Sequence, residues 1–202
     1  PALIADSGFD VLAHALEGWV GTNANPMTDA LAADAFRIAY SLLEASFSGD
    51  KTVRLDVHIA STMAGLAFTQ AGLGLCHALS HSLGGQFHLP HGRLNAILLP
   101  AVVSVNTEFA GRKYAELARR MGLGSGSDTM SVRNLKNALV RLRNALKLPG
   151  TLTQAGVPAA ELTARTDAII KAALADPCCA TNPGAATEDM ARRVLREVAG
   201  RG

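Results

Sequence analysis

Apolar residues recur at helical intervals through almost the whole chain, and this periodicity constrains the fold more than any other feature. Hydrophobic residues make up 49% of the 202 residues, aromatic residues only 4%, and alanine is abundant. Alanine and leucine favour helices over strands, and no segment reads as a convincing strand. The sequence therefore predicts an all-α fold, a helical bundle, and its length fits a single domain over residues 1–202.

Glycine, proline and asparagine separate the predicted helices. We expect helices over residues 6–20, 28–47, 53–68, 76–85, 93–105, 131–147, 161–176 and 187–200. Asp6 and Ser7 give the first helix a capping signal. The glycine pair at 84–85 is expected to end the fourth helix, and Pro90 to keep the following segment, which includes His91, in a loop.

Charge and hydropathy argue against several classes of function. The formal charge is +2, from 19 basic and 17 acidic residues. The basic residues after Gly111 are interrupted by acidic and apolar ones, which favours solvated helix faces over a nucleic-acid-binding stripe. No stretch reaches the roughly 18 uncharged apolar residues of a membrane span, so we expect no membrane insertion. Three cysteines make no disulfide framework and indicate a reducing, cytoplasmic environment.

Four of the six histidines are concentrated between His77 and His91. His77 and His81 are four residues apart, as are Asp10 and His14, so each pair lies on one face of its predicted helix. Imidazole and carboxylate together suit zinc or ferrous iron. The spacing indicates a metal site built from two helices and a loop. It does not tell which histidine is left over if the site takes four ligands.

Three longer motifs resemble the iron-dependent (group III) alcohol dehydrogenases. They are DSGFDVLAHALEGWV, GLGLCHALSHSLGGQFHLPHGRLNAILLP and ALADPCCATNPGAATEDM, and the resemblance extends along essentially the entire chain. It covers the all-helical C-terminal domain of that family, whose architecture is shared with dehydroquinate synthases. The family's N-terminal dinucleotide-binding domain is expected to be absent from this chain, because no G-x-G-x-x-G motif occurs.

The resemblance, matched residue by residue, implies that Asp10, His14, His77 and His91 are the metal ligands. His81 matches a family residue near the nicotinamide and the substrate, which implies a cofactor contact and a catalytic role in proton relay. The implied cofactors are Fe2+, with zinc as the alternative, and NAD or NADP in the full-length enzyme.

The resemblance also implies an activity. It is the interconversion of short-chain primary alcohols and aldehydes by metal-assisted hydride transfer, in an oxidoreductase that forms a homodimer or a larger oligomer. The isolated domain is expected to be inactive, since hydride transfer needs the cofactor domain. The alternatives are a polyol- or glycerol-type dehydrogenase using zinc, a non-catalytic helical module stabilised by metal, and a metal hydrolase with Glu17 as its general base.

The neighbouring histidine and cysteines are given no ligand role. His88 is expected on the surface, and Cys76 is expected to be a small buried residue. Cys178 and Cys179 are expected to contribute to packing or turn geometry rather than to redox chemistry.

Overall fold

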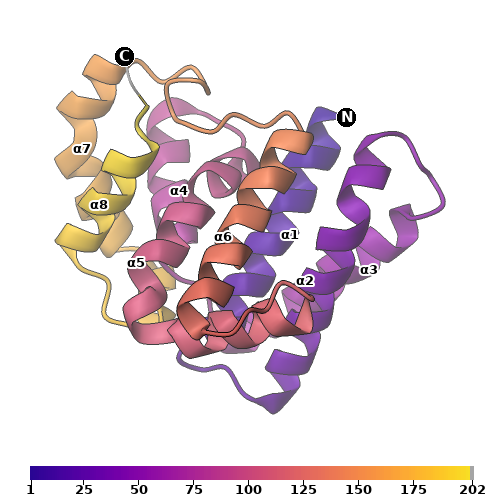
Figure 1. Cartoon of the computed structure of the whole chain (residues 1–202). Helices are drawn as coiled ribbons and strands as arrows, with labels where there is room; N and C mark the ends of the chain where they lie inside the picture. The colour runs from indigo at the N-terminus through magenta and orange to yellow at the C-terminus, as the bar shows by residue number, and fades with distance from the viewer. Residues whose placement is uncertain (201–202) are drawn as a thin grey trace.

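The computed structural model describes residues 1–200, which form eight α-helices and one short 3-10 helix (Figure 1). The helices are α1 (Ala2–Val20), α2 (Pro26–Phe47), α3 (Arg54–Ala71), α4 (Leu75–Phe87), α5 (His91–Arg120), α6 (Asp128–Ala145), α7 (Ala159–Leu174), η1 (Pro177–Thr181) and α8 (Glu188–Val198). No strand occurs within residues 1–200, which confirms the all-α prediction.

Helix α1 lies inside the bundle, packed against α2, α3 and α5. Phe9, Leu12 and Trp19 on this helix are buried almost completely, in keeping with a helix that is apolar on nearly every face. Asp10 and His14 lie on the same helix and are only partly exposed. The first predicted pair of polar residues is therefore held at the edge of the hydrophobic core rather than on an outer surface.

Helix α5 is much longer than predicted and packs against α1, α4, α6 and α8. It begins at His91 and continues through the buried Pro100 to Arg120, so the segment after Pro90 is helix rather than loop. Its length and apolar composition would suffice to cross a membrane, but 72% of the apolar window is buried inside the bundle. Burial of this extent is what the core helix of a folded domain requires.

Two predicted helix ends differ from the structure for identifiable reasons. Helix α1 starts at Ala2, so Asp6 lies inside it and does not cap it. Asp6 instead accepts hydrogen bonds of 3.2 and 3.0 Å from the guanidinium of Arg93 on α5. Helix α4 runs through the glycine pair at 84–85 to Phe87, because glycine weakens a helix without necessarily ending it.

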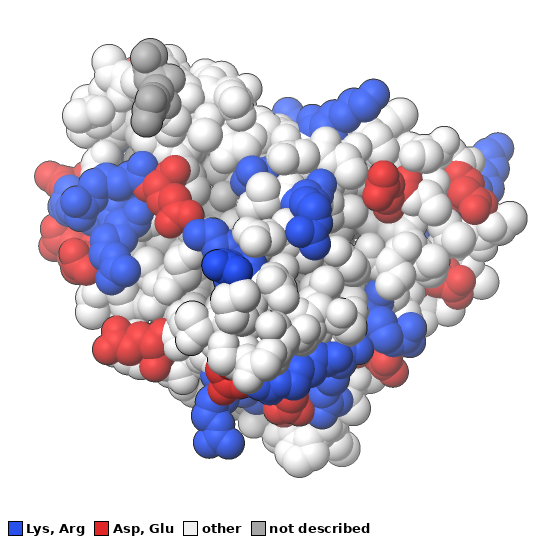
Figure 2. All heavy atoms as spheres, viewed as in Figure 1, with Lys and Arg blue, Asp and Glu red and all other residues white. Residues whose placement is uncertain are grey.

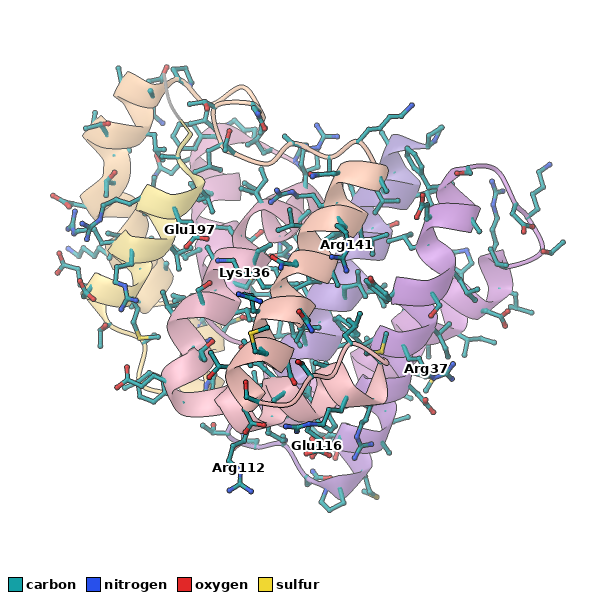
Figure 3. All side chains as sticks on the ribbon, viewed as in Figure 1. Arg37, Arg112, Glu116, Lys136, Arg141 and Glu197 are labelled. Atoms are coloured by element: carbon teal, nitrogen blue, oxygen red, sulfur yellow. The ribbon has the colours of Figure 1, made fainter. Side chains whose placement is uncertain are left out.

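About half of the lysine and arginine side chains in residues 1–200 form ion pairs with carboxylates. Lys136 on α6 points toward Glu197 on α8, with 2.9 Å between Nζ and Oε1, and also donates to Ser104 Oγ on α5 (Figure 3). On the face drawn in Figure 2, basic side chains lie beside acidic ones rather than in a continuous stripe. This mixed pattern agrees with the interpretation of the basic residues after Gly111 as solvated helix faces.

Candidate metal centre

Three helices bring together the four residues singled out as ligands. Asp10 and His14 come from α1, His77 from α4 and His91 from the start of α5, and one donor atom from each lies within 4.8 Å of the others. Asp10 Oδ1 is 3.6 Å from His77 Nε2 and 3.5 Å from His91 Nε2. Asp10 Oδ2 is 3.8 Å from His14 Nδ1. These separations suit donors around one ion with bonds of about 2.1 Å.

Burial and the nearby carboxylates set the protonation of the four residues. Burial disfavours the imidazolium of His77, but hydrogen bonds to Asp10 and Glu17 outweigh it and raise the pKa of His77 to about 9. Burial lowers the pKa of His14 to about 4, and it lowers the pKa of His91 as well. Burial also disfavours the Asp10 carboxylate, yet His77 and the other imidazoles hold its pKa below the ordinary value. An entering metal ion would thus displace one proton, from His77.

Glu17 holds the imidazole of His77 from behind. Its Oε2 lies 2.6 Å from His77 Nδ1, and its Oε1 accepts a 2.7 Å hydrogen bond from the backbone N–H of Cys76. When Nδ1–H donates to Glu17, Nε2 is the nitrogen left to face Asp10, an arrangement common behind metal-binding histidines. The hydrolase alternative loses its general base, because Glu17 is buried and engaged with His77 and the start of α4.

The start of α4 is in close contact with the side chains of Glu17 and Asn182. Asn182 Oδ1 accepts a 3.1 Å hydrogen bond from the backbone N–H of Leu75. A Cβ at Gly74 would lie 2.8 Å from that same Oδ1 and 2.9 Å from Glu17 Oε1. Glycine at this position therefore lets both side chains reach the first N–H groups of α4, which have no partner within the helix.

His91 is positioned by the close approach of α5 to α1. A Cβ at Gly92 would lie 2.0 Å from the carbonyl oxygen of Asp6, so only glycine fits without a shift. The Ser80 hydroxyl donates to the His91 carbonyl and lies 3.2 Å from His91 Nδ1, which leaves Nε2 facing Asp10. The prediction of His91 in a loop was wrong, because His91 is the first residue of α5.

Asn95, one turn into α5, touches three of the four residues. Its Nδ2 lies 2.6 Å from Asp10 Oδ1, 3.0 Å from His91 Nε2 and 3.3 Å from His77 Nε2. Cys76 lies behind it, fully buried, which confirms the prediction for that cysteine. The amide of Asn95 therefore helps to fix the relative positions of the donor atoms.

His81 turns away from this group. Its Nδ1 lies 2.8 Å from Asp176 Oδ2, its side chain is 44% exposed, and its ring stacks on that of His91 with centroids 5.2 Å apart. Burial disfavours the Asp176 carboxylate, but hydrogen bonds from the Cys178 backbone and from His81 lower its pKa. Of the two histidines on α4, only His77 is directed at Asp10.

Sequence reasoning missed the partners that orient these histidines. Glu17 was considered only as a base, and Asp176 and Asn182 were given no role. Their contacts to α4 span 60, 95 and 107 residues, so no local spacing reveals them. The one readable signal is Asp176 before Pro177, since an aspartate ahead of a proline is typical of a helix start.

The fold and the four converging side chains define a class: an all-helical domain that brings one carboxylate and three imidazoles together, a set of donor types that iron and zinc accept. The family model for the Fe-containing alcohol dehydrogenase family, C-terminal, matches residues 4–199. The chain belongs to the iron-containing alcohol dehydrogenase family, and it corresponds to the C-terminal domain.

Individual relatives agree with this assignment. The 1-propanol dehydrogenase of Salmonella typhimurium is 40% identical over 204 residues, covering 98% of this chain and 55% of the relative. The NADPH-dependent butanol dehydrogenase of Clostridium saccharobutylicum is 36% identical over 195 residues, covering 96% and 50%. The crystal structure of a 1,3-propanediol oxidoreductase superposes with a TM-score of 0.91 at 32% identity, covering 98% and 52%. The chain thus spans about half the length of these relatives.

Proposed function

We propose that the chain is the metal-binding catalytic domain of an NAD(P)-dependent alcohol dehydrogenase that interconverts short-chain primary alcohols and aldehydes. One observation carries the proposal: donor atoms of Asp10, His14, His77 and His91 lie within 4.8 Å of one another in a member of the iron-containing family. The relatives named for 1-propanol and butanol support a small alcohol as the substrate.

The four donor residues would hold Fe2+, with Zn2+ as the alternative metal, since three imidazoles and one carboxylate suit both ions. The bound ion would supply a Lewis acid that polarises the oxygen of the alcohol or aldehyde. Glu17 would keep Nε2 of His77 directed at the ion, and Gly92 would let His91 approach it. Phe68, whose ring stacks on His14 with centroids 4.5 Å apart, would present an apolar surface beside the ion.

His81 would carry the alcohol proton between the substrate and solvent and would lie against the nicotinamide. Its ring stacks on His91, while nearly half of its side chain is exposed, so it connects the ligand group with the surface. Asp176 would orient the ring by accepting from Nδ1. Imidazole suits this role because its two ring nitrogens can accept a proton on one side and release one on the other.

The remaining parts of the enzyme would lie outside residues 1–202. We propose that these residues form a single helical domain, supported by one continuous cluster of buried apolar side chains drawn from all eight α-helices. NAD or NADP would bind a separate dinucleotide-binding domain, so this domain alone would be inactive. We also propose that the full-length enzyme forms a homodimer or a larger oligomer and is located in the cytoplasm. It would bind neither nucleic acid nor membranes.

The first experiment is the metal content of the anaerobically purified chain. We expect at least one iron or zinc per chain, with one equivalent lost in His77→Ala and in His91→Ala while helical circular dichroism persists. His58→Ala is the matched control, since His58 is exposed on α3 and should leave the metal content unchanged. Full metal content in both ligand variants would overturn the site.

Activity is tested on the full-length enzyme loaded with either ion. We expect NAD(P)-dependent oxidation of 1-propanol with Fe2+, and loss of this activity in His77→Ala. Oxidation of glycerol with Zn2+, in place of 1-propanol with Fe2+, would instead favour the polyol dehydrogenase alternative.

A further inference from the structure

A second group of donor side chains lies on the solvent side of the candidate metal centre. His81, Asp176 and Cys178 each offer one ligand atom, and these three atoms lie within 4.8 Å of one another. They come from α4 and from the start of η1, two segments that pack together. The group combines an imidazole nitrogen, a carboxylate oxygen and a sulfur, whereas the first group has no sulfur donor.

We propose that His81, Asp176 and Cys178 form a second metal site, selective for Zn2+ and similar borderline-soft ions. Three protein donors with one position open to solvent are typical of an accessible zinc site. A thiolate among the ligands favours zinc over hard ions such as Mg2+ or Ca2+. The site shares no donor with the first metal centre, and it uses His81 and Asp176, the two residues of the proposed proton relay.

The two oxygens of the Asp176 carboxylate already contact the other two members of this group. Asp176 Oδ1 accepts a 2.8 Å hydrogen bond from the backbone N–H of Cys178, which fixes the turn. The other oxygen, Oδ2, lies 2.8 Å from His81 Nδ1. Burial, followed by the contact with Asp176, raises the pKa of the Cys178 thiol to about 12, so this sulfur keeps its proton until a cation replaces it.

Charge and protons balance when zinc enters. The thiol releases its proton to solvent, and the imidazole donates a lone pair from one ring nitrogen while the other nitrogen keeps its proton. A thiolate and a carboxylate then offset the two positive charges of the ion. The thiol therefore contributes one released proton for each zinc bound.

Occupation of this site would inhibit the enzyme, a consequence that rests on the proposed function. Zinc would occupy the lone pair of one His81 ring nitrogen, and that nitrogen could then no longer accept and release a proton. Inhibition by added Zn2+ would thus remain after the first site is filled with iron.

Cobalt(II) tests the site because it reports sulfur ligation directly. We would titrate the anaerobic, reduced 202-residue chain with Co2+ and record its absorption spectrum. A thiolate-to-cobalt charge-transfer band in the near ultraviolet is expected, with about two Co2+ bound per chain at saturation. Added Zn2+ should abolish the band by displacing the cobalt.

The adjacent cysteine provides the matched control. Cys178→Ser should abolish the band and the second equivalent of cobalt, and Asp176→Asn should weaken it. Cys179→Ser should leave the band unchanged, since Cys179 Sγ instead donates to the Ala173 carbonyl.

Circular dichroism checks that each variant is folded. Saturation at one Co2+ without a charge-transfer band, or a band that survives Cys178→Ser, would overturn the proposal. Neither result depends on whether the full-length enzyme oxidises alcohols.

Discussion

Glu17 Oε2 lies 2.6 Å from Nδ1 of His77, and both side chains are almost completely buried. Glu17 comes from the end of α1 and His77 from the first turn of α4, so this contact joins the helix that carries Asp10 to the next candidate ligand. The same carboxylate accepts from the backbone N–H of Cys76. It therefore fixes the position of α4 and holds Nδ1 of His77, which leaves Nε2 directed at Asp10.

Replacing Glu17 by glutamine should weaken metal binding without abolishing the fold. The amide has the same shape but no charge, and loss of such a partner typically lowers metal affinity by about 10–100-fold. Competition with a chromophoric chelator measures the affinity. Glu44→Gln, at an exposed position on α2, is the control and should bind metal like the parent chain. Equal affinities in the two variants would contradict the role of Glu17.

Alanine at position 92 should disturb the site and the fold together. Its Cβ would lie 2.0 Å from the Asp6 carbonyl oxygen, and α5 must move away from α1 to accommodate it. We expect a loss of about 1–3 kcal/mol in the free energy of unfolding, together with weaker metal binding. Gly85→Ala is the control, because that position on α4 has open space, and it should stabilise the domain by about 0.5–1 kcal/mol. A Gly92→Ala variant as stable as the parent would show that this contact is unimportant.

Metal affinity should fall as the pH falls through neutrality. The pKa of His77 is raised to about 9, so the metal-free chain binds a proton on this ring at lower pH, and the ion must displace it. His14, with a pKa lowered to about 4, should bind no competing proton there. We expect the dissociation constant of the first site to rise about tenfold for each unit from roughly pH 8 to pH 6. Cys178→Ser removes the contribution of the second group, and a pH-independent constant would contradict this assignment of protons.

Asp176→Asn should lower the kcat of the full-length enzyme, because the variant no longer holds the His81 ring with a carboxylate. Loss of a positioned acid–base group costs roughly 10²–10⁴-fold in kcat, so His81→Ala should show a fall of that order and Asp176→Asn a smaller one. Both variants should keep the iron of the first site. Asp176→Glu should recover part of the loss, and the pH profile of kcat should shift in Asp176→Asn. A fall in kcat with an unchanged pH profile would indicate a structural role only.

Chelation of the metal should leave the domain folded. The buried apolar cluster includes side chains from all eight α-helices, and five of these helices carry none of the four candidate ligands. Such a core stabilises the bundle by itself, unlike small domains whose folding free energy comes from zinc. Circular dichroism before and after dialysis against a chelator should show the same helical content. Unfolding on metal removal would favour the non-catalytic, metal-stabilised module instead.

Local sequence patterns predicted the helices better than their ends. Helical spacing of apolar residues located the segments, because an amphipathic helix can bury only one face. The passage through Pro100 was predicted, but the start of α5 at His91 and its continuation beyond Val105 to Arg120 were missed. The packing of this helix against four others outweighs the local signals for a loop.

The amino-acid sequence by itself determined the all-α class, the two pairs spaced four residues apart, and the set of side chains from which a metal site can be built. Spacing alone did not tell which histidine of α4 faces Asp10, and only the tertiary structure gives the physical reason why it is His77, as the family resemblance implied. His77 and His81 share one helix face, and their different orientations depend on Glu17 and Asp176, which are 60 and 95 residues distant in the chain. The spacing of residues along a helix determines which face of the helix a side chain lies on. The hydrogen-bond partner of that side chain depends on how distant segments of the chain pack together.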